Sequence, residues 1–129
     1  MKYLGIDYGA KRIGTAISDK DGRIAFPHRV IPNSRDAASR VARLVAEEHI
    51  AAIVIGDTRA VSGAANPVTK EAEEFAKRIS AHTDIPVTRV WEAWSSIEST
   101  RYTEGAKNDA SAAAIILQRF LDMRGGSVE

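Results

Sequence analysis

The first third of the chain shows the alternation of hydrophobic and polar positions that is typical of β-strands. Residues 2–7 predict a short strand, and residues 13–18 predict a second one whose side chains alternate between two faces. An Asp-Gly turn within residues 19–22 predicts a hairpin that leads into a third strand over residues 23–31. Because Pro27 cannot donate a ladder hydrogen bond, this third strand is expected at a sheet edge or broken in two.

The middle of the chain alternates between helical spacing and a buried strand. Ser34 is expected to cap a helix that ends near residue 49. The continuous apolar run over residues 51–56 predicts a strand that is buried on both faces, as parallel strands are. After a loop, Asn66 and Pro67 supply a cap and a first helical residue, so a second helix is expected to begin there.

The last third predicts one more strand and two helices. Residues 86–91 form the fifth expected strand, and Ser95 with Glu98 gives a capping-box pattern for a short helix. Asn108 is expected to cap a final helix that reaches about residue 123. The expected order is β-β-β-α-β-α-β-α-α, which predicts a single α/β domain over residues 1–129. We expect a five-stranded mixed sheet with helices on both faces.

Composition narrows the possible functions. The chain has 129 residues, of which 44% are hydrophobic, and no apolar run approaches the length of a membrane span. It has no cysteine, which excludes disulfides, zinc–thiolate sites and thiol catalysis and fits a cytoplasmic location. The net charge is only +1, so nucleic acid would have to bind through a local basic patch.

Three acidic residues fall where strands and helices of such a domain meet. Asp7 ends the first strand, Glu92 follows the fifth, and Asp109 lies in the first turn of the last helix, on its apolar side. If the first strand is central, these carboxylates converge at one edge, where their repulsion requires a cation. Oxygen ligands match Mg²⁺ or Mn²⁺, and two such ions hold both reacting oxygens of a phosphodiester.

Each acid also has a simpler interpretation. Asp109 would favour the positive end of its helix whether or not it binds a metal. Glu92 could be a solvated loop residue. Asp7 is harder to explain this way, because an aspartate is unfavourable in a strand and costly to desolvate without a partner.

Several segments resemble the YqgF/RuvX family. Residues 4–19 (LGIDYGAKRIGTAISD) resemble the opening of that family, and residues 108–121 (NDASAAAIILQRFL) resemble its closing helix. Ser62-Gly63, followed by residues 72–76, is similar to its middle region. The resemblance covers nearly the whole chain, and the first and last motifs together make it specific.

The resemblance implies an RNase H-like fold and a metal-dependent nuclease that matures the 5′ end of precursor 16S ribosomal RNA. Members of the family were formerly regarded as Holliday-junction resolvases, by analogy with RuvC. Carried over by position, the acids of the family fall on Asp7, Glu92 and Asp109. These are the residues that the pattern of strands and helices also selects.

The chain departs from the family after two of its strands. The family has Asp-Glu-Arg after the fifth strand, whereas residues 91–93 are Trp-Glu-Ala, so the expected arginine is missing. Its role would pass to Arg59, Arg89 or Arg101, or be lost.

After the fourth strand the family has Gly-Leu-Pro, where this chain has Gly56-Asp57-Thr58. One hypothesis makes Asp57 a fourth metal-binding carboxylate, because neighbouring strands lie only about 4.8 Å apart. The alternative is an Asx-turn at the start of a loop.

A second group of residues could contact nucleic acid. Lys11 and Arg12 follow the first strand and could hold a phosphate near the metals, although an ordinary solvated turn has the same composition. Arg59 and Trp94 are further candidates, Trp94 by stacking on an unpaired base. Core packing is expected for at least one tryptophan. The arginines of the first long helix, Arg35, Arg40 and Arg43, are interpreted as its solvated face.

The function predicted from these features is hydrolysis of RNA with Mg²⁺ or Mn²⁺, two ions being proposed. RNA, including ribosome precursors, is the favoured partner, and the chain is expected to be a monomer or weak homodimer without membrane contact. A structure-selective DNA-junction nuclease remains an alternative and requires a symmetric dimer. A non-catalytic ribosome-assembly module is a further alternative. An actin-like ATPase is less compatible, because such proteins need two domains and this chain supplies one.

Overall fold

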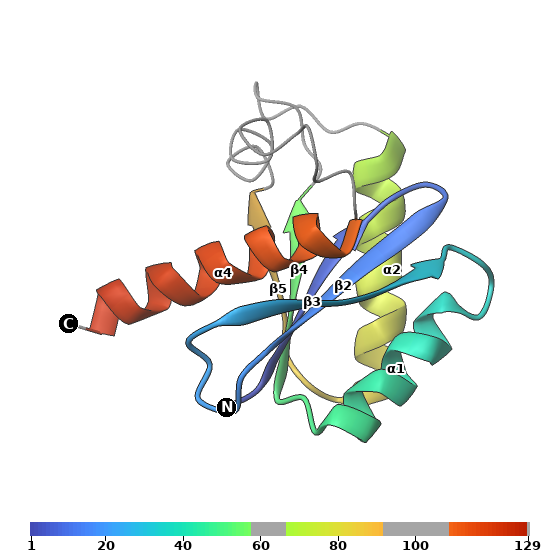
Figure 1. Cartoon of the computed structure of the whole chain (residues 1–129). Coiled ribbons are helices and arrows are strands. Elements are labelled where there is room, and N and C mark those ends of the chain that lie inside the picture. The colour runs from blue at the N-terminus through green and yellow to red at the C-terminus, as the bar shows by residue number, and fades with distance from the viewer. Residues whose placement is uncertain (58–66, 92–108, 129) are drawn as a thin grey trace.

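The domain is built on one mixed sheet with the strand order β3-β2-β1-β4-β5. The computed structural model describes the chain apart from residues 58–66, 92–108 and 129, and in it α1 and α2 cover one face and α4 the other (Figure 1). The elements are β1 (Tyr3–Tyr8), β2 (Arg12–Ser18), β3 (Ala25–Pro32), α1 (Ala37–Glu48), β4 (Ala52–Asp57), α2 (Pro67–Thr83), β5 (Val87–Trp91) and α4 (Asp109–Val128).

β1 is the central strand of the sheet, which is the condition under which the predicted acids can converge. β1 pairs antiparallel with β2 and parallel with β4, and β4 pairs parallel with β5. The carboxyl ends of β1, β4 and β5 therefore lie together at one end of the sheet. We call this end the active edge, because the acids are predicted to lie there. The apolar run of β4 is buried on both faces, as its composition predicts.

β3 is an edge strand, which confirms the prediction from Pro27, but it is not broken there. The strand instead contains a bulge, because Thr15 pairs with Arg29 whereas the next residue, Ala16, pairs with Pro27. His28 is thus the extra residue in β3. The bulge lets a proline enter the strand while pairing with β2 continues on both sides.

Two helix boundaries differ from those predicted. α1 begins at Ala37 rather than after Ser34, because the hydroxyl of Ser34 donates to the carboxylate of Asp36 and Asp36 is the residue that precedes the helix. α4 continues to Val128, beyond the predicted end. α2 begins at Pro67 as predicted. The short helix predicted from residue 95 lies outside the described residues.

The sheet separates two hydrophobic clusters. The cluster beneath α1 and α2 contains the alternate residues Leu4, Ile6 and Tyr8 of β1, and the ring of Tyr8 lies 5.1 Å from that of Phe75. The cluster beneath α4 is formed by Tyr3, Ala16, Ala52, Val54, Ala113, Ile116, Leu117 and Leu121. Among the described helices, none is long and apolar enough to serve as a membrane span.

The position of α4 is set by a close approach to β1. A Cβ added to Gly5 would lie 2.7 Å from the Cβ of Leu117 and 3.0 Å from the carbonyl oxygen of Ala113. Farther along α4, the ring of Phe120 lies 5.7 Å from that of Tyr3, which precedes Gly5 in β1. α4 therefore runs antiparallel to β1, and its first residues lead toward the carboxyl end of that strand.

Gly5→Ala is expected to destabilise the domain by about 1–3 kcal/mol, because the added methyl group meets helix backbone that must shift. Urea unfolding measures this change in the free energy of unfolding. Ser39→Ala, at an exposed position of α1, is the control and should change it by less than about 0.5 kcal/mol. A Gly5→Ala protein as stable as the control would contradict the close approach.

Candidate active site

Asp7 lies one residue before the carboxyl end of β1. It pairs with Gly14 of β2 and is half-buried. Its neighbours Ile6 and Tyr8 belong to the cluster beneath α1 and α2. Because side chains alternate along a strand, Asp7 occupies a position of the opposite face, the one that α4 covers.

Asp109 is the first residue of α4. From the contact at Ala113 and Gly5, one helical turn backward leads to Asp109, and two strand residues forward lead to Asp7. Both steps span about 6 Å, and they run in the same direction. The packing of α4 on β1 therefore brings these two predicted acids to the same edge of the sheet.

The remaining acids are less fully described. Glu92 follows Trp91, the last residue of β5, and lies outside the described residues, although the carboxyl end of β5 belongs to the active edge. Asp57 is the last residue of β4. Continuing the observed pairing of Ile6 with Ile55 puts Gly56 beside Asp7, and position 57 beside Tyr8. The register thus does not favour Asp57 as a neighbour of Asp7, and its metal-binding role stays a prediction.

The donor chemistry of the predicted set suits a hard divalent cation. Asp7, Glu92 and Asp109 offer only carboxylate oxygens, and the chain has no cysteine to provide a soft ligand. Within the part of the chain that the structure describes, no three acidic or histidine side chains form a group able to hold a metal ion. Glu92, the third predicted ligand, lies outside that part.

The turn that follows β1 is held in place by Asn33. Its side-chain amide donates to the carbonyl oxygens of Gly9 at 2.8 Å and Ala10 at 3.4 Å, and its backbone N–H donates to that of Lys11 at 3.0 Å. A Cβ on Gly9 would lie 2.5 Å from the carbonyl oxygen of Arg12, so this turn requires glycine. Lys11 and Arg12 are exposed at the active edge, where a phosphate could reach them.

Arg89 forms an ion pair away from the predicted acids. Its guanidinium lies 3.1 Å from Glu73 of α2, and its strand partner is Ile55, whose side chain belongs to the cluster beneath α1 and α2. Arg89 is thus on the face opposite Asp7 and is poorly placed to replace the arginine absent at position 93. The other candidates from the sequence, Arg59, Arg101 and Trp94, lie outside the described residues.

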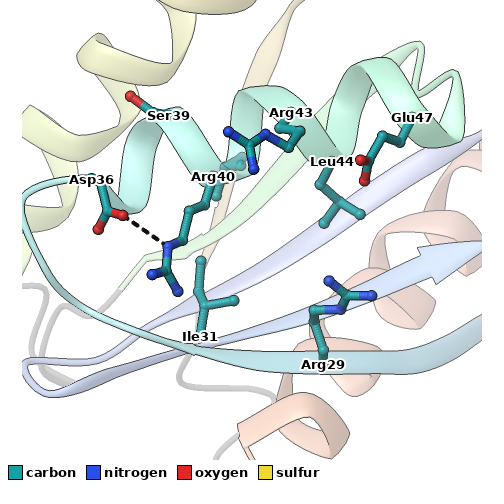
Figure 2. A pocket seen from close by; sticks show the side chains of 9 residues that line it. Arg29, Ile31, Asp36, Ser39, Arg40, Arg43, Leu44 and Glu47 are labelled. Atoms are coloured by element: carbon teal, nitrogen blue, oxygen red, sulfur yellow. Dashed lines mark hydrogen bonds and ion pairs between the residues drawn. The ribbon is translucent and has the colours of Figure 1, made fainter.

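A basic groove that the sequence did not predict lies between α1 and β3 (Figure 2). We call it the α1–β3 groove. Its volume is about 370 Å³, and its lining consists of Arg29, Ile31, Asp36, Ser39, Arg40, Val41, Arg43, Leu44 and Glu47. The one sequence feature that could have indicated the groove is the spacing of Arg40 and Arg43, which puts both on one side of α1. The part played by Arg29 depends on the bulge, which the sequence does not reveal.

Residues 1–123 match the model of a protein family described as "RuvX: Holliday junction resolvase". The chain belongs to the RuvX family. It is 36% identical to a protein of Oleidesulfovibrio alaskensis, over 95% of this chain and 93% of that protein. It is 39% identical to one of Nitratidesulfovibrio vulgaris, over 95% of this chain and 94% of that protein. Both relatives are provisionally named pre-16S rRNA nuclease.

Solved structures identify the fold of this RuvX chain as RNase H-like, which confirms the expectation from the sequence. RuvC of Thermus thermophilus aligns with a TM-score of 0.65 at 16% identity, covering 98% of this chain and 97% of RuvC. The Holliday junction resolvase of fowlpox virus aligns with a TM-score of 0.58 at 15% identity, covering 95% of this chain and 99% of the resolvase. Family membership makes the chain a nuclease, a hydrolase of phosphodiester bonds.

Asn33→Asp tests the support of the turn after β1. Aspartate has nearly the same size but donates no hydrogen bond from its side chain, so the carbonyls of Gly9 and Ala10 lose their donor. We expect a loss of about 1 kcal/mol in the free energy of unfolding at neutral pH. Unchanged stability in urea unfolding would show that the amide does not hold the turn.

Proposed function

We propose that this RuvX chain is a metal-dependent nuclease that trims the 5′ end of precursor 16S ribosomal RNA in the cytoplasm. The names of its relatives suggest the substrate. The observation that carries the chemistry is the antiparallel packing of α4 on β1, which leads Asp109 and Asp7 to one edge of the sheet. The residues expected to act there come from parts of the chain that are distant in sequence.

In this proposal Asp7, Glu92 and Asp109 hold two Mg²⁺ or Mn²⁺ ions. When bound, such a pair supplies the charge stabilisation that in-line attack of water on a phosphodiester requires. Lys11 and Arg12 hold the phosphate beside the acids and neutralise part of its charge. No side chain forms a covalent bond to the substrate, so the chain needs neither a serine nor a cysteine nucleophile.

A DNA junction is the second candidate substrate, favoured by the description of the family model. Cutting a four-way junction symmetrically requires two active sites that face two strands, and therefore a two-fold dimer. The mass of the protein in solution separates the two candidates. A protein that stays monomeric when it cuts argues for the RNA substrate.

The Asp7→Asn variant should lose cleavage of a precursor 16S RNA fragment by at least about 100-fold, because one metal-binding carboxylate becomes a neutral amide. A chelator should abolish cleavage by the unmodified protein. Asp21→Asn is the matched control, since Asp21 is exposed in the β2–β3 hairpin at the opposite edge. Cleavage by Asp7→Asn at the rate of this control would refute the active-site assignment.

Titration calorimetry with Mn²⁺ tests the remaining ligands. Glu92→Gln and Asp109→Asn are each expected to weaken binding, because each removes a negative oxygen donor. Asp57→Asn distinguishes the two hypotheses for that residue. Unchanged affinity, which the strand register favours, would discard Asp57 as a fourth carboxylate, whereas weaker binding would establish it.

A further inference from the structure

We propose that the α1–β3 groove binds backbone phosphates of the RNA strand that continues beyond the active edge. The inference rests on the proposed nuclease function and adds a second contact region to it. A nuclease that acts on a long RNA gains affinity from phosphates away from the cleaved bond. In this chain, with its net charge of +1, such contacts have to come from a local group of cations.

The groove has the shape and the side chains to bind the sugar-phosphate backbone of an RNA strand. Figure 2 shows Arg40 extending from α1 toward β3 near Asp36 and Arg29 extending from β3 toward α1 nearer to Glu47, so guanidinium groups stand along the groove with Ile31 between them. Arg43 is one helical turn beyond Arg40. Planar guanidinium groups bind phosphate oxygens in a bidentate manner. Ile31 and Leu44 supply apolar surface between the arginines, against which a ribose can pack.

The charges of the groove leave two arginines available. The Nε of Arg40 lies 3.0 Å from Asp36, and the pKa of Asp36 is held below its ordinary value by the hydroxyl of Ser34 and then by Arg40. Asp36 therefore stays ionised and keeps Arg40 in position. Neither Arg29 nor Arg43 forms an ion pair with any residue that the structure describes. The carboxylate of Glu47 also lines the groove, and the pKa of Glu48 is lowered mainly by Lys2 and to a smaller extent by Arg29, so the three arginines exceed the two acids of the lining by one charge.

The backbone of Arg29 is held in place next to the bulge in β3. The fully buried hydroxyl of Thr15 donates to the carbonyl oxygen of Arg29 at 2.6 Å and accepts its backbone N–H at 3.1 Å. These two bonds fix the strand next to His28, the extra residue. Bulges redirect side chains at sheet edges. Here the redirected residue is the arginine that forms the β3 side of the groove.

The groove is connected to the active edge. One end of it is at Asp36, three residues after Asn33, and Asn33 holds the turn that carries Lys11. That turn follows Asp7 in the chain. In this proposal an RNA strand leaves the active edge past Lys11 and follows the segment from Asn33 to Asp36 into the groove on the α1 and α2 face.

The test is RNA binding by the double variant Arg29→Gln/Arg43→Gln. Fluorescence anisotropy with a labelled single-stranded RNA, in the absence of divalent ions, measures affinity while cleavage is prevented. Each phosphate contact to a single strand contributes about 0.7 to the salt slope, so the slope should become shallower by about 1.4 and affinity should fall about tenfold. Arg23→Gln/Arg78→Gln is the matched control, because it removes the same charge from exposed positions elsewhere.

A double variant that keeps the affinity and salt slope of the control would overturn the inference. So would a loss of affinity for polyglutamate without a loss for RNA, because the groove would then serve an acidic protein. These results do not depend on catalysis. Cleavage by Asp7→Asn would refute the nuclease site alone, and an unchanged salt slope in the double variant would refute the groove alone.

Discussion

The active edge depends on the close approach of α4 to β1 at Gly5. A helix that carries side chains usually stands off a sheet by the width of those side chains, but here the absence of a Cβ lets Leu117 and the backbone of Ala113 reach the strand. The approach fixes how far α4 is displaced along β1. Since Asp7 and Asp109 both lie about 6 Å from this contact in the same direction, a shift of the helix by one turn would move Asp109 along β1 away from Asp7. A glycine in the core thus sets where the first residue of α4 lies relative to Asp7.

The two faces of the sheet contribute differently. The α4 face carries Asp7 and the helix that begins at Asp109, whereas the α1 and α2 face carries the larger hydrophobic cluster and, along its outer border, the α1–β3 groove. Asn33 connects them, because it holds the turn after β1 and precedes the helix that forms one wall of the groove. In the proposed function, a chain with a net charge of only +1 offers acidic metal ligands and a group of arginines for RNA on one domain.

The sequence predicted what depends on local chemistry. The Asp-Gly hairpin, the edge position of the strand that contains Pro27 and the start of α2 at Pro67 are all confirmed. Prediction from the sequence failed where a contact with another residue determines the local structure. Ser34 bonds to Asp36 instead of capping the helix. Arg40 and Arg43 are exposed, as their interpretation as a solvated face predicts, but the bulge that brings Arg29 opposite them has no signature in single-residue patterns.

The central claim is that Asp7 and Asp109 share bound metal ions. A crystal structure of the protein grown with Mn²⁺, with anomalous scattering recorded to locate the ions, tests it most directly. The account predicts an anomalous peak about 2.1 Å from carboxylate oxygens of both residues, the distance expected for a hard divalent ion. Manganese bound to other groups, with the two carboxylates turned away from each other, would contradict it.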